Sequence, residues 1–405
     1  MNLLNLEEPV QHSAKWYQPK HAPLLMLAFR PLFLLGSLWA CAAMIAWFAI
    51  LSGYLSWPGT FPATLWHAHE MLFGFASAIA IGFLFTAARN WTGVSTLNSW
   101  PLLGLCVVWA CARVAGIWSA QPLLWLIILQ GLFWLISICH FTWVVLQVHN
   151  SNNYLFVPVL ALLATLNMVF IVVLDQHAYE LAGLLSQMTV LGFTLLISIL
   201  GGRVVPFFIS RGLGLPHQQR TPRLDKALLL VSVLGMCGFF AHHFLQQPIV
   251  PGYLLILAGL LHMLRASFWF QARLFTVPLL WSLYLAYLSM ATGLIGFGAA
   301  YLGSSWLAKD ALHLITIGGM GMMILAMMAR VALGHTARPL TPHPLISVAF
   351  ILCLISALIR SLLPAYVGPH LAWQISALIW STSFALFAFI YAPILVRKRL
   401  DGRRG

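Results

Sequence analysis

The sequence predicts an all-α, polytopic integral membrane protein with about twelve transmembrane helices. Of its 405 residues, 61% are hydrophobic and only 7% are charged, whereas soluble domains carry about 25% charged residues. A spanning helix needs about 20 predominantly apolar residues, and twelve stretches of the chain meet that length. The distribution of lysine and arginine between the two sides of the predicted membrane is the third observation.

The twelve apolar stretches are separated by clusters of proline, glycine and polar residues, which favour turns. WPGTFP (57–62) and HTARPLTPHP (335–344) are two of these clusters. With no soluble segment of any size, we expect one transmembrane domain over 1–405, with a short cytoplasmic segment 1–28 and a basic tail 397–405. The helices are expected at 29–52, 63–87, 100–119, 122–147, 154–174, 179–201, 224–246, 249–270, 276–302, 308–332, 344–364 and 371–396.

The basic residues support this count independently. Twelve spans put both termini on one side, and if that side is the cytoplasm, all but Arg113, Lys309 and Arg360 of the 21 lysines and arginines fall inside. This is the bias of the positive-inside rule. The net charge of +13 therefore reports topology, and no nucleic-acid partner is expected. The polar first 23 residues lack an apolar core, so no cleaved signal peptide is expected.

Six cysteines are present, but none forms a CxxC or CxxCH motif. The sequence therefore indicates neither a redox dithiol nor covalent attachment of a c-type haem.

Two histidines lie at matched depth on the predicted outer side. His67 is about five residues into the second stretch and His313 about five into the tenth, so at about 1.5 Å per residue both sit ~7 Å below the outer interface. Such residues can meet across a bundle. Ionisable groups inside a membrane are costly and usually functional, although a lone histidine can also be a satisfied core residue.

Helical phase complicates this outer group. On a regular helix, His67 and Glu70 share a face, whereas His69 points almost the opposite way. One metal cannot take both imidazoles, so either they serve different neighbours or one is structural. Gly74, below His67 and Glu70, would allow either a flat macrocycle or another helix to approach closely.

Methionines and glycines follow His313 along its stretch. Met320 and Met327 share a face with Thr316, and thioethers can bind haem iron or Cu(I), although such stripes usually pack cores. The glycines of GGMG (318–321) give a surface for close helix packing or for a flat cofactor.

A second group of candidates lies on the predicted inner side. Arginines there are topology anchors, or they pair with haem propionates, since the arginine fork matches a carboxylate. A histidine among them leaves room for a second cofactor or for a point where electrons arrive. The group comprises Arg89, Trp91, Arg203, His262, Arg265, Arg330 and His335.

The chain resembles the NnrS family of bacterial membrane proteins. The resemblance is carried by five blocks in family order. They are LAFRPLFLLGSLWA (27–40), LWHAHEMLFGFASAIAIGFLFTAARNWTG (65–93), GGRVVPFF (201–208), LLHMLRASFWF (260–270) and HLITIGGMGMMILAMMARVALGHTARPL (313–340).

The resemblance implies a haem b and copper protein of about twelve helices in the bacterial cytoplasmic membrane, protecting against nitrosative stress. It puts His67, His69, His262, His313 and His335 at motif positions as metal ligands. Arg89, Trp91, Arg203, Arg265 and Arg330 occupy further motif positions and are our candidates for cofactor binding. Family members often have a histidine after the eighth helix, where this chain has LLWSLYLAY with Tyr284, a phenol able to donate a hydrogen bond or proton.

Three functions remain open from the sequence. The first is reduction of nitric oxide at a His-ligated haem, with copper or the acid Glu70 assisting electron and proton delivery. The second is a haem sensor or scavenger of nitric oxide without catalysis. The third, a transporter of copper or an iron complex, is disfavoured because the charges cluster near the two faces rather than at the midplane. The sequence does not identify the electron donor.

Overall fold

The computed structural model describes residues 22–117, 123–149 and 151–403, and the secondary structure of these residues is helical. Twelve helices among them are long and apolar enough to cross a membrane, which confirms the predicted count. They are α1 (Phe29–Leu51), α2–η2–α3 (Ala63–Thr92), α4 (Ser99–Ile117), α5 (Leu124–Gln147), α6 (Phe156–Asp175), α7 (Tyr179–Leu213), α8 (Pro222–Phe244), α9 (Gly252–Trp269), α10 (Pro278–Ala300), α11–η5–α12 (Ala308–His335), α13 (Pro344–Leu362) and α15 (Pro369–Val396).

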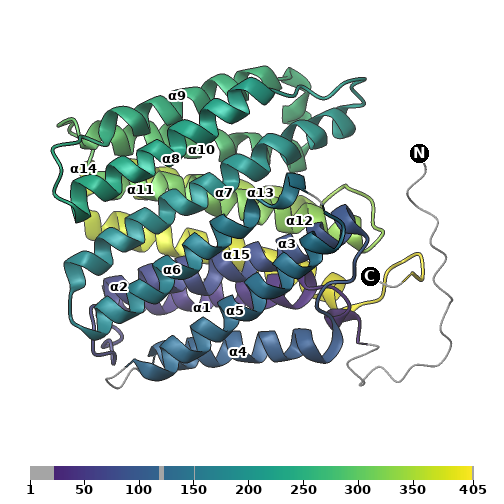
Figure 1. The fold of residues 1–405 in the computed structure, drawn as a ribbon, viewed down its shortest axis with the longest axis horizontal. Coiled ribbons are helices and arrows are strands. Elements are labelled where there is room, and N and C mark those ends of the chain that lie inside the picture. Colours follow the sequence, from purple (N-terminus) through teal and green to yellow (C-terminus); the bar gives the residue numbers. More distant parts are fainter. Residues whose placement is uncertain (1–21, 118–122, 150, 404–405) are drawn as a thin grey trace.

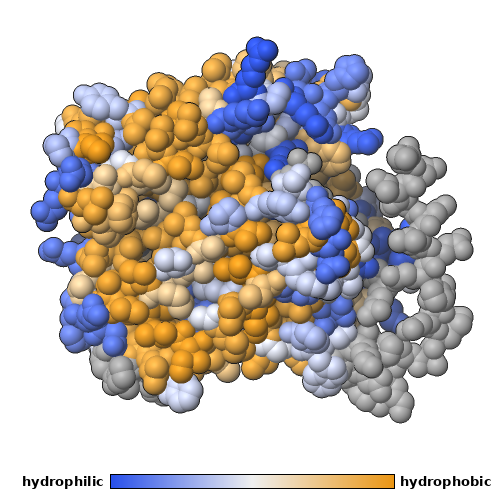
Figure 2. Space-filling model, viewed as in Figure 1, coloured by the Kyte–Doolittle hydropathy of each residue, from blue (hydrophilic) through white to orange (hydrophobic). Residues whose placement is uncertain are grey.

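A short helix, η1 (Pro23–Leu25), precedes α1, and three others lie in the connections: η3 (Ser151–Asn153), η4 (Ala272–Thr276) and α14 (Pro364–Val367). Figure 1 shows the long helices packed roughly side by side as one bundle. In Figure 2 the visible surface is hydrophobic between the two ends of the bundle and hydrophilic at those ends. Such a belt matches a lipid bilayer, and the chain is a multi-pass membrane protein.

The two ends of the bundle are named here by the connections they carry. The terminal face holds 93–98, 214–221, 336–343 and 397–403. The start of α1 meets the end of α15 there, because Arg30 Nη1 donates to the carbonyl oxygens of Leu395 and Arg397 at 2.9 and 2.7 Å. The far face holds 52–62, 176–178, 245–251 and 301–307. Of the predicted N-terminal segment 1–28, residues 1–21 lie outside the described residues.

One predicted boundary is wrong. The sixth stretch was expected to end at 201, but α7 continues through Gly202 and Arg203 to Leu213, with Pro206 inside it. Arg203 is held by the neighbouring connection, since its Nη1 donates to Asn153 Oδ1 at 2.9 Å. The helix ends only at Gly214, whose φ of 65° suits glycine.

Two of the spans change helix type just after a candidate histidine. η2 (Glu70–Ala76) follows His69 and η5 (Leu314–Gly321) follows His313, and both are π-helical. A π-helix bonds residue i to i+5, so its turn is wider than that of an α-helix, and such segments are frequent at functional sites. The prediction of side-chain direction from a regular 100° turn therefore fails beyond these points.

Candidate functional site

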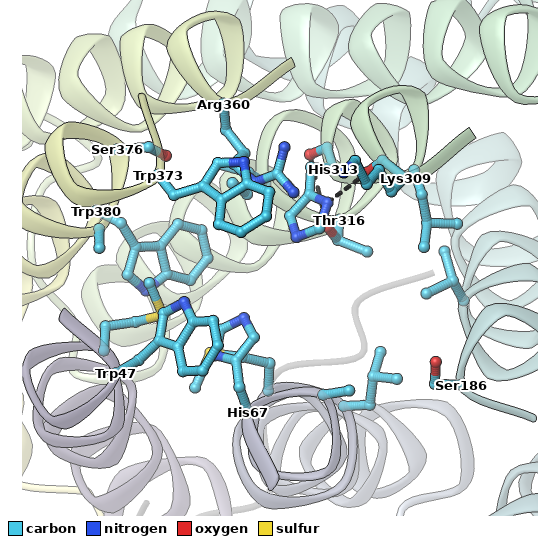
Figure 3. A pocket seen from close by; sticks show the side chains of 18 of the residues that line it. Trp47, His67, Ser186, Lys309, His313, Thr316, Arg360, Trp373, Ser376 and Trp380 are labelled. Atoms are coloured by element: carbon cyan, nitrogen blue, oxygen red, sulfur yellow. Dashed lines mark hydrogen bonds between the residues drawn. The ribbon is translucent and has the colours of Figure 1, made fainter. Parts of the chain in front are cut away.

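A cavity of about 350 Å³ lies toward the far face, and both His67 and His313 line it. They belong to different spans, α2 and α11, and Figure 3 shows their side chains at the same cavity. Trp47 of α1 lies flat on His67, with ring centroids 4.8 Å apart and planes 14° apart. The two imidazoles, predicted to lie at matched depth, therefore line one cavity from two different spans.

The two imidazoles leave ring nitrogens for a ligand. His313 Nδ1 lies 2.6 Å from the carbonyl oxygen of Lys309, and a carbonyl can only accept. In the neutral imidazole Nδ1 therefore carries the proton and Nε2 keeps its lone pair. A backbone carbonyl commonly fixes a metal-binding histidine in this tautomer. His67 Nδ1 is buried and has no hydrogen-bond partner in the described part of the chain.

Two cations and an indole form another side of this cavity. Both cations lie near Trp373, with Lys309 Nζ 5.3 Å and Arg360 Cζ 4.9 Å from its ring centroid, and Figure 3 shows all three residues at the cavity. Arg360 is also paired with the buried Asp310, Nη1 to Oδ1 at 2.6 Å. Such groups can hold an anionic substituent of a ligand while the indoles cover its apolar surface.

His69 and Glu70 do not line this cavity. Glu70 is fully buried and its Oε1 accepts from His69 Nδ1 at 2.8 Å. Its Oε2 accepts from Arg113 Nη1 at 2.6 Å and from Trp39 Nε1 at 2.8 Å. The expected direction of Glu70 is therefore wrong: its side chain does not join His67 at the cavity but meets His69, α1 and α4.

The other ring nitrogen of His69 is also engaged. Trp134 Nε1 donates to Asn167 Oδ1 at 2.9 Å, which directs the amide nitrogen of Asn167 toward His69 Nε2 at 3.1 Å. Gln130 Nε2 also lies 3.4 Å from that atom. With both nitrogens hydrogen-bonded, His69 belongs to a buried polar network of α1, α2–η2, α4, α5 and α6, and it leaves no lone pair for a metal in this arrangement.

Gly74 serves that network rather than a cofactor. A Cβ atom there would lie 2.4 Å from Arg113 Nη1 and 2.6 Å from Glu70 Oε2. The glycines of η5 serve close packing in the same way. A Cβ on Gly318 would meet Ser289 of α10 at 2.9 Å, and one on Gly321 would meet Trp380 of α15 at 2.4 Å.

The candidate residues predicted on the inner side do not form one site. Trp91, Arg203 and His335 line a second cavity of about 540 Å³ together with Asn90, whose Nδ2 lies 3.3 Å from His335 Nε2. Arg89 lies in the last turn of α3, next to Asn90 in the chain. Arg330 instead lies on Phe208, its Cζ 3.8 Å from the ring centroid.

His262 and Arg265 belong to a separate hydrogen-bonded cluster among α7, α8, α9 and α10. Both are buried, and both bond to the hydroxyl of Tyr287, His262 through Nδ1 and Arg265 through Nε and Nη2. Arg265 also donates to Asp225 Oδ1 at 2.9 Å. Tyr284, one turn before Tyr287, packs instead among Phe270 and Phe275. The phenol of LLWSLYLAY that meets a histidine is therefore Tyr287.

The sequence was compared with models of known protein families. A family model described as the NnrS protein matches residues 23–399, nearly the whole chain. The chain belongs to the NnrS family. NnrS membership makes it a membrane protein of the nitric-oxide response. A comparison with curated proteins found no match.

In this NnrS protein the far-face cavity has contributors that the sequence interpretation did not select: Trp47, Lys309, Arg360 and Trp373. A signal for the two cations existed. Lys309, Arg360 and Arg113 are the three basic residues that the positive-inside distribution leaves on the outer side. A charged side chain near or within the membrane costs free energy, so each of the three needs a structural or functional partner. Two of them line the cavity and the third pairs with Glu70.

Proposed function

We propose that this protein binds nitric oxide at a haem b in the far-face cavity, with reduction of nitric oxide as the reaction. The observation that supports the proposal most is the pair of imidazoles, His67 and His313, which line one cavity from two separate spans. His313 is held by the Lys309 carbonyl with Nε2 free to coordinate, and His67 has a buried, unpartnered Nδ1.

The lining of the cavity fits a haem in three respects. A haem iron needs an imidazole ligand, and His67 or His313 would supply it while leaving a position open for nitric oxide. Its propionates need cations, which Lys309 and Arg360 can supply as an ammonium and a guanidinium. Its flat apolar ring needs aromatic walls, and three tryptophans line the cavity: Trp47, Trp373 and Trp380. When bound, haem iron supplies a coordination site for nitric oxide and electrons for its reduction.

This chain's own residues would then orient the ligand and supply protons. The 2.6 Å bond from His313 Nδ1 to the Lys309 carbonyl fixes the orientation of the imidazole. Lys309 and Thr316 carry exchangeable protons in the lining. Glu70, selected from sequence as the acid, is occupied by three donors outside the cavity, and we give it a structural role in the buried network of His69.

Copper fits the described residues less well. Residues 22–117, 123–149 and 151–403 contain no group of three or more histidine, cysteine, aspartate or glutamate side chains placed to hold a metal ion. Copper therefore stays a proposal from family resemblance, and no chemical step here runs through it.

We further infer that the terminal face lies in the cytoplasm of a bacterium and the far-face cavity near the opposite surface. The distribution of the 21 lysines and arginines supports this orientation.

Absorption spectra of the purified protein, oxidised and then reduced with dithionite, test the haem assignment. With haem supplied during expression, we expect Soret and α bands, and a featureless spectrum would refute it. Nitric oxide is then added to the reduced protein and N2O is measured. Evolution of N2O in proportion to the nitric oxide consumed supports a reductase, whereas a spectral change without N2O supports a sensor or scavenger.

A further inference from the structure

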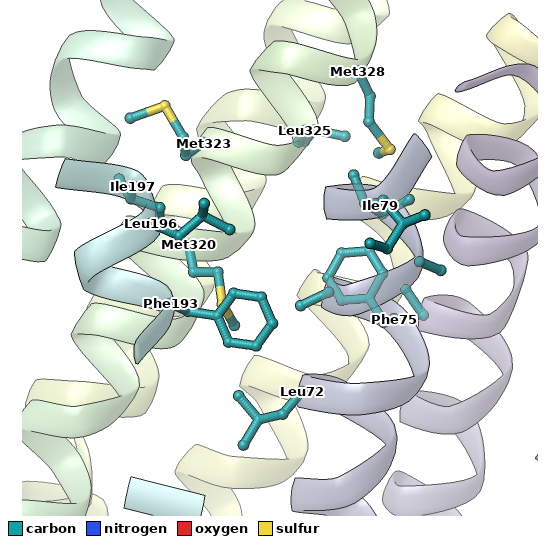
Figure 4. Packing of buried hydrophobic residues seen from close by; sticks show 14 of the residues in the cluster. Leu72, Phe75, Ile79, Phe193, Leu196, Ile197, Met320, Met323, Leu325 and Met328 are labelled. Carbon is teal, nitrogen blue, oxygen red and sulfur yellow. The ribbon is translucent and has the colours of Figure 1, made fainter. Parts of the chain in front are cut away.

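A third cavity lies between the two already described. It measures about 80 Å³ and is lined by α1, η2–α3, α7 and η5–α12. Figure 4 shows part of its lining, with Ile79 on one side and Phe193, Leu196, Ile197, Met320 and Met323 on the other. Met320 also lines the far-face cavity, and Phe83 and Val204 also line the terminal-face cavity. The three spaces therefore follow one another along the bundle, each separated from the next by shared side chains.

The chemistry of the middle cavity differs from that of its neighbours. Its lining contains only apolar side chains and Gly201, whereas the outer two contain histidine and arginine. A buried water needs two to four polar partners, and cavities without them stay dry and take apolar guests such as xenon. By this measure about 10–15 Å³ holds one water, so a cavity of about 80 Å³ has room for a diatomic molecule.

We propose that these cavities form one passage that binds small, neutral, apolar molecules of the size of a diatomic gas and carries them between the far-face and terminal-face cavities. Ions and protonated groups are excluded from the middle cavity because nothing there replaces their hydration. Met320 separates the middle cavity from the His67 and His313 imidazoles, and Phe83 separates it from His335. The inference rests on the lining of the cavities and holds whether or not haem occupies the far-face cavity.

Xenon tests the passage without nitric oxide or haem. Crystals of the full chain are pressurised with xenon, and its positions are found by anomalous diffraction. We expect a xenon site enclosed by Ile79, Phe193 and Met323. Absence of xenon from this cavity in the wild-type protein, with xenon bound elsewhere in the same crystals, would overturn the proposal.

Two variants change the passage in opposite directions. Ala80→Phe adds a ring to the lining and should abolish the xenon site, whereas Phe83→Ala should open the middle cavity to the terminal-face cavity and raise the xenon occupancy. Ala110→Phe adds the same ring at an exposed position of α4 and should leave the xenon site unchanged. Equal xenon occupancy in Ala80→Phe and Ala110→Phe, both folded by thermal unfolding, would contradict the passage.

Discussion

Replacing Arg113 by leucine is expected to destabilise the folded protein by about 3–5 kcal/mol, because it leaves the buried Glu70 carboxylate without its cation. Glu70 is fully buried and Arg113 nearly so, and the Nη1 to Oε2 distance is 2.6 Å. Glu70→Leu should cost a similar amount, since it leaves the guanidinium uncompensated. The free energy of unfolding in mixed detergent micelles is the quantity to measure.

The double variant Glu70→Leu/Arg113→Leu distinguishes a coupled pair from two independent losses of packing. If the pair is coupled, the double variant loses less stability than the two single variants added together, by about 1–3 kcal/mol. Asp401→Asn is the matched control, because Asp401 pairs with Arg399 at 2.7 Å on an accessible part of the tail. Exposed pairs contribute only about 0–1 kcal/mol. A loss in Arg113→Leu no larger than in Asp401→Asn would contradict a structural role for this network.

Removal of an imidazole from the far-face cavity is expected to have the largest effect on haem content. We expect His313→Ala and His67→Ala each to lower the haem bound per protein at least about tenfold, since even the loss of a group that merely orients a metal ligand costs 10–100-fold in affinity. Imidazole added to the buffer should restore part of the haem in His313→Ala by entering the space left by the side chain. Haem is measured from the absorption spectrum relative to protein concentration.

Two other histidines serve as comparisons for these variants. His217→Ala changes an exposed loop residue and should leave haem content unchanged. His335→Ala changes the terminal-face cavity and should also retain the far-face haem. Loss of haem in His335→Ala alone, with His67→Ala and His313→Ala unaffected, would move the site to the terminal face.

The sequence predicted the helices well because apolar length and basic residues are local or additive signals. Eleven of the twelve spans begin and end within a few residues of the predicted positions. The exception is the sixth span, α7, which continues past Gly201 and Gly202. The level of a residue along its helix was also predictable, since distance along a helix follows from residue number. His67 and His313 accordingly lie at one cavity.

The direction of side chains and the identity of neighbours were not predictable in the same way. The π-helical turns at Glu70 and Leu314 change the direction of every following residue, and no composition signal marks them. Arg113 and Asn167 meet Glu70 and His69 through helix contacts that a single sequence does not specify. Their residue types nevertheless gave a clue, because a cation on the outer side and an asparagine inside a span both need partners.

The rate of nitric oxide consumption in Ser186→Trp tests the proposed far-face site most directly. Ser186 lines the cavity opposite His67 and His313 (Figure 3), so an indole there reduces the space for a ligand while both imidazoles remain. Ser267→Trp adds the same indole at an exposed position of α9 as the control. We predict that reduced Ser186→Trp consumes nitric oxide far more slowly than wild type and Ser267→Trp. Wild-type consumption by Ser186→Trp would contradict binding of nitric oxide in the far-face cavity.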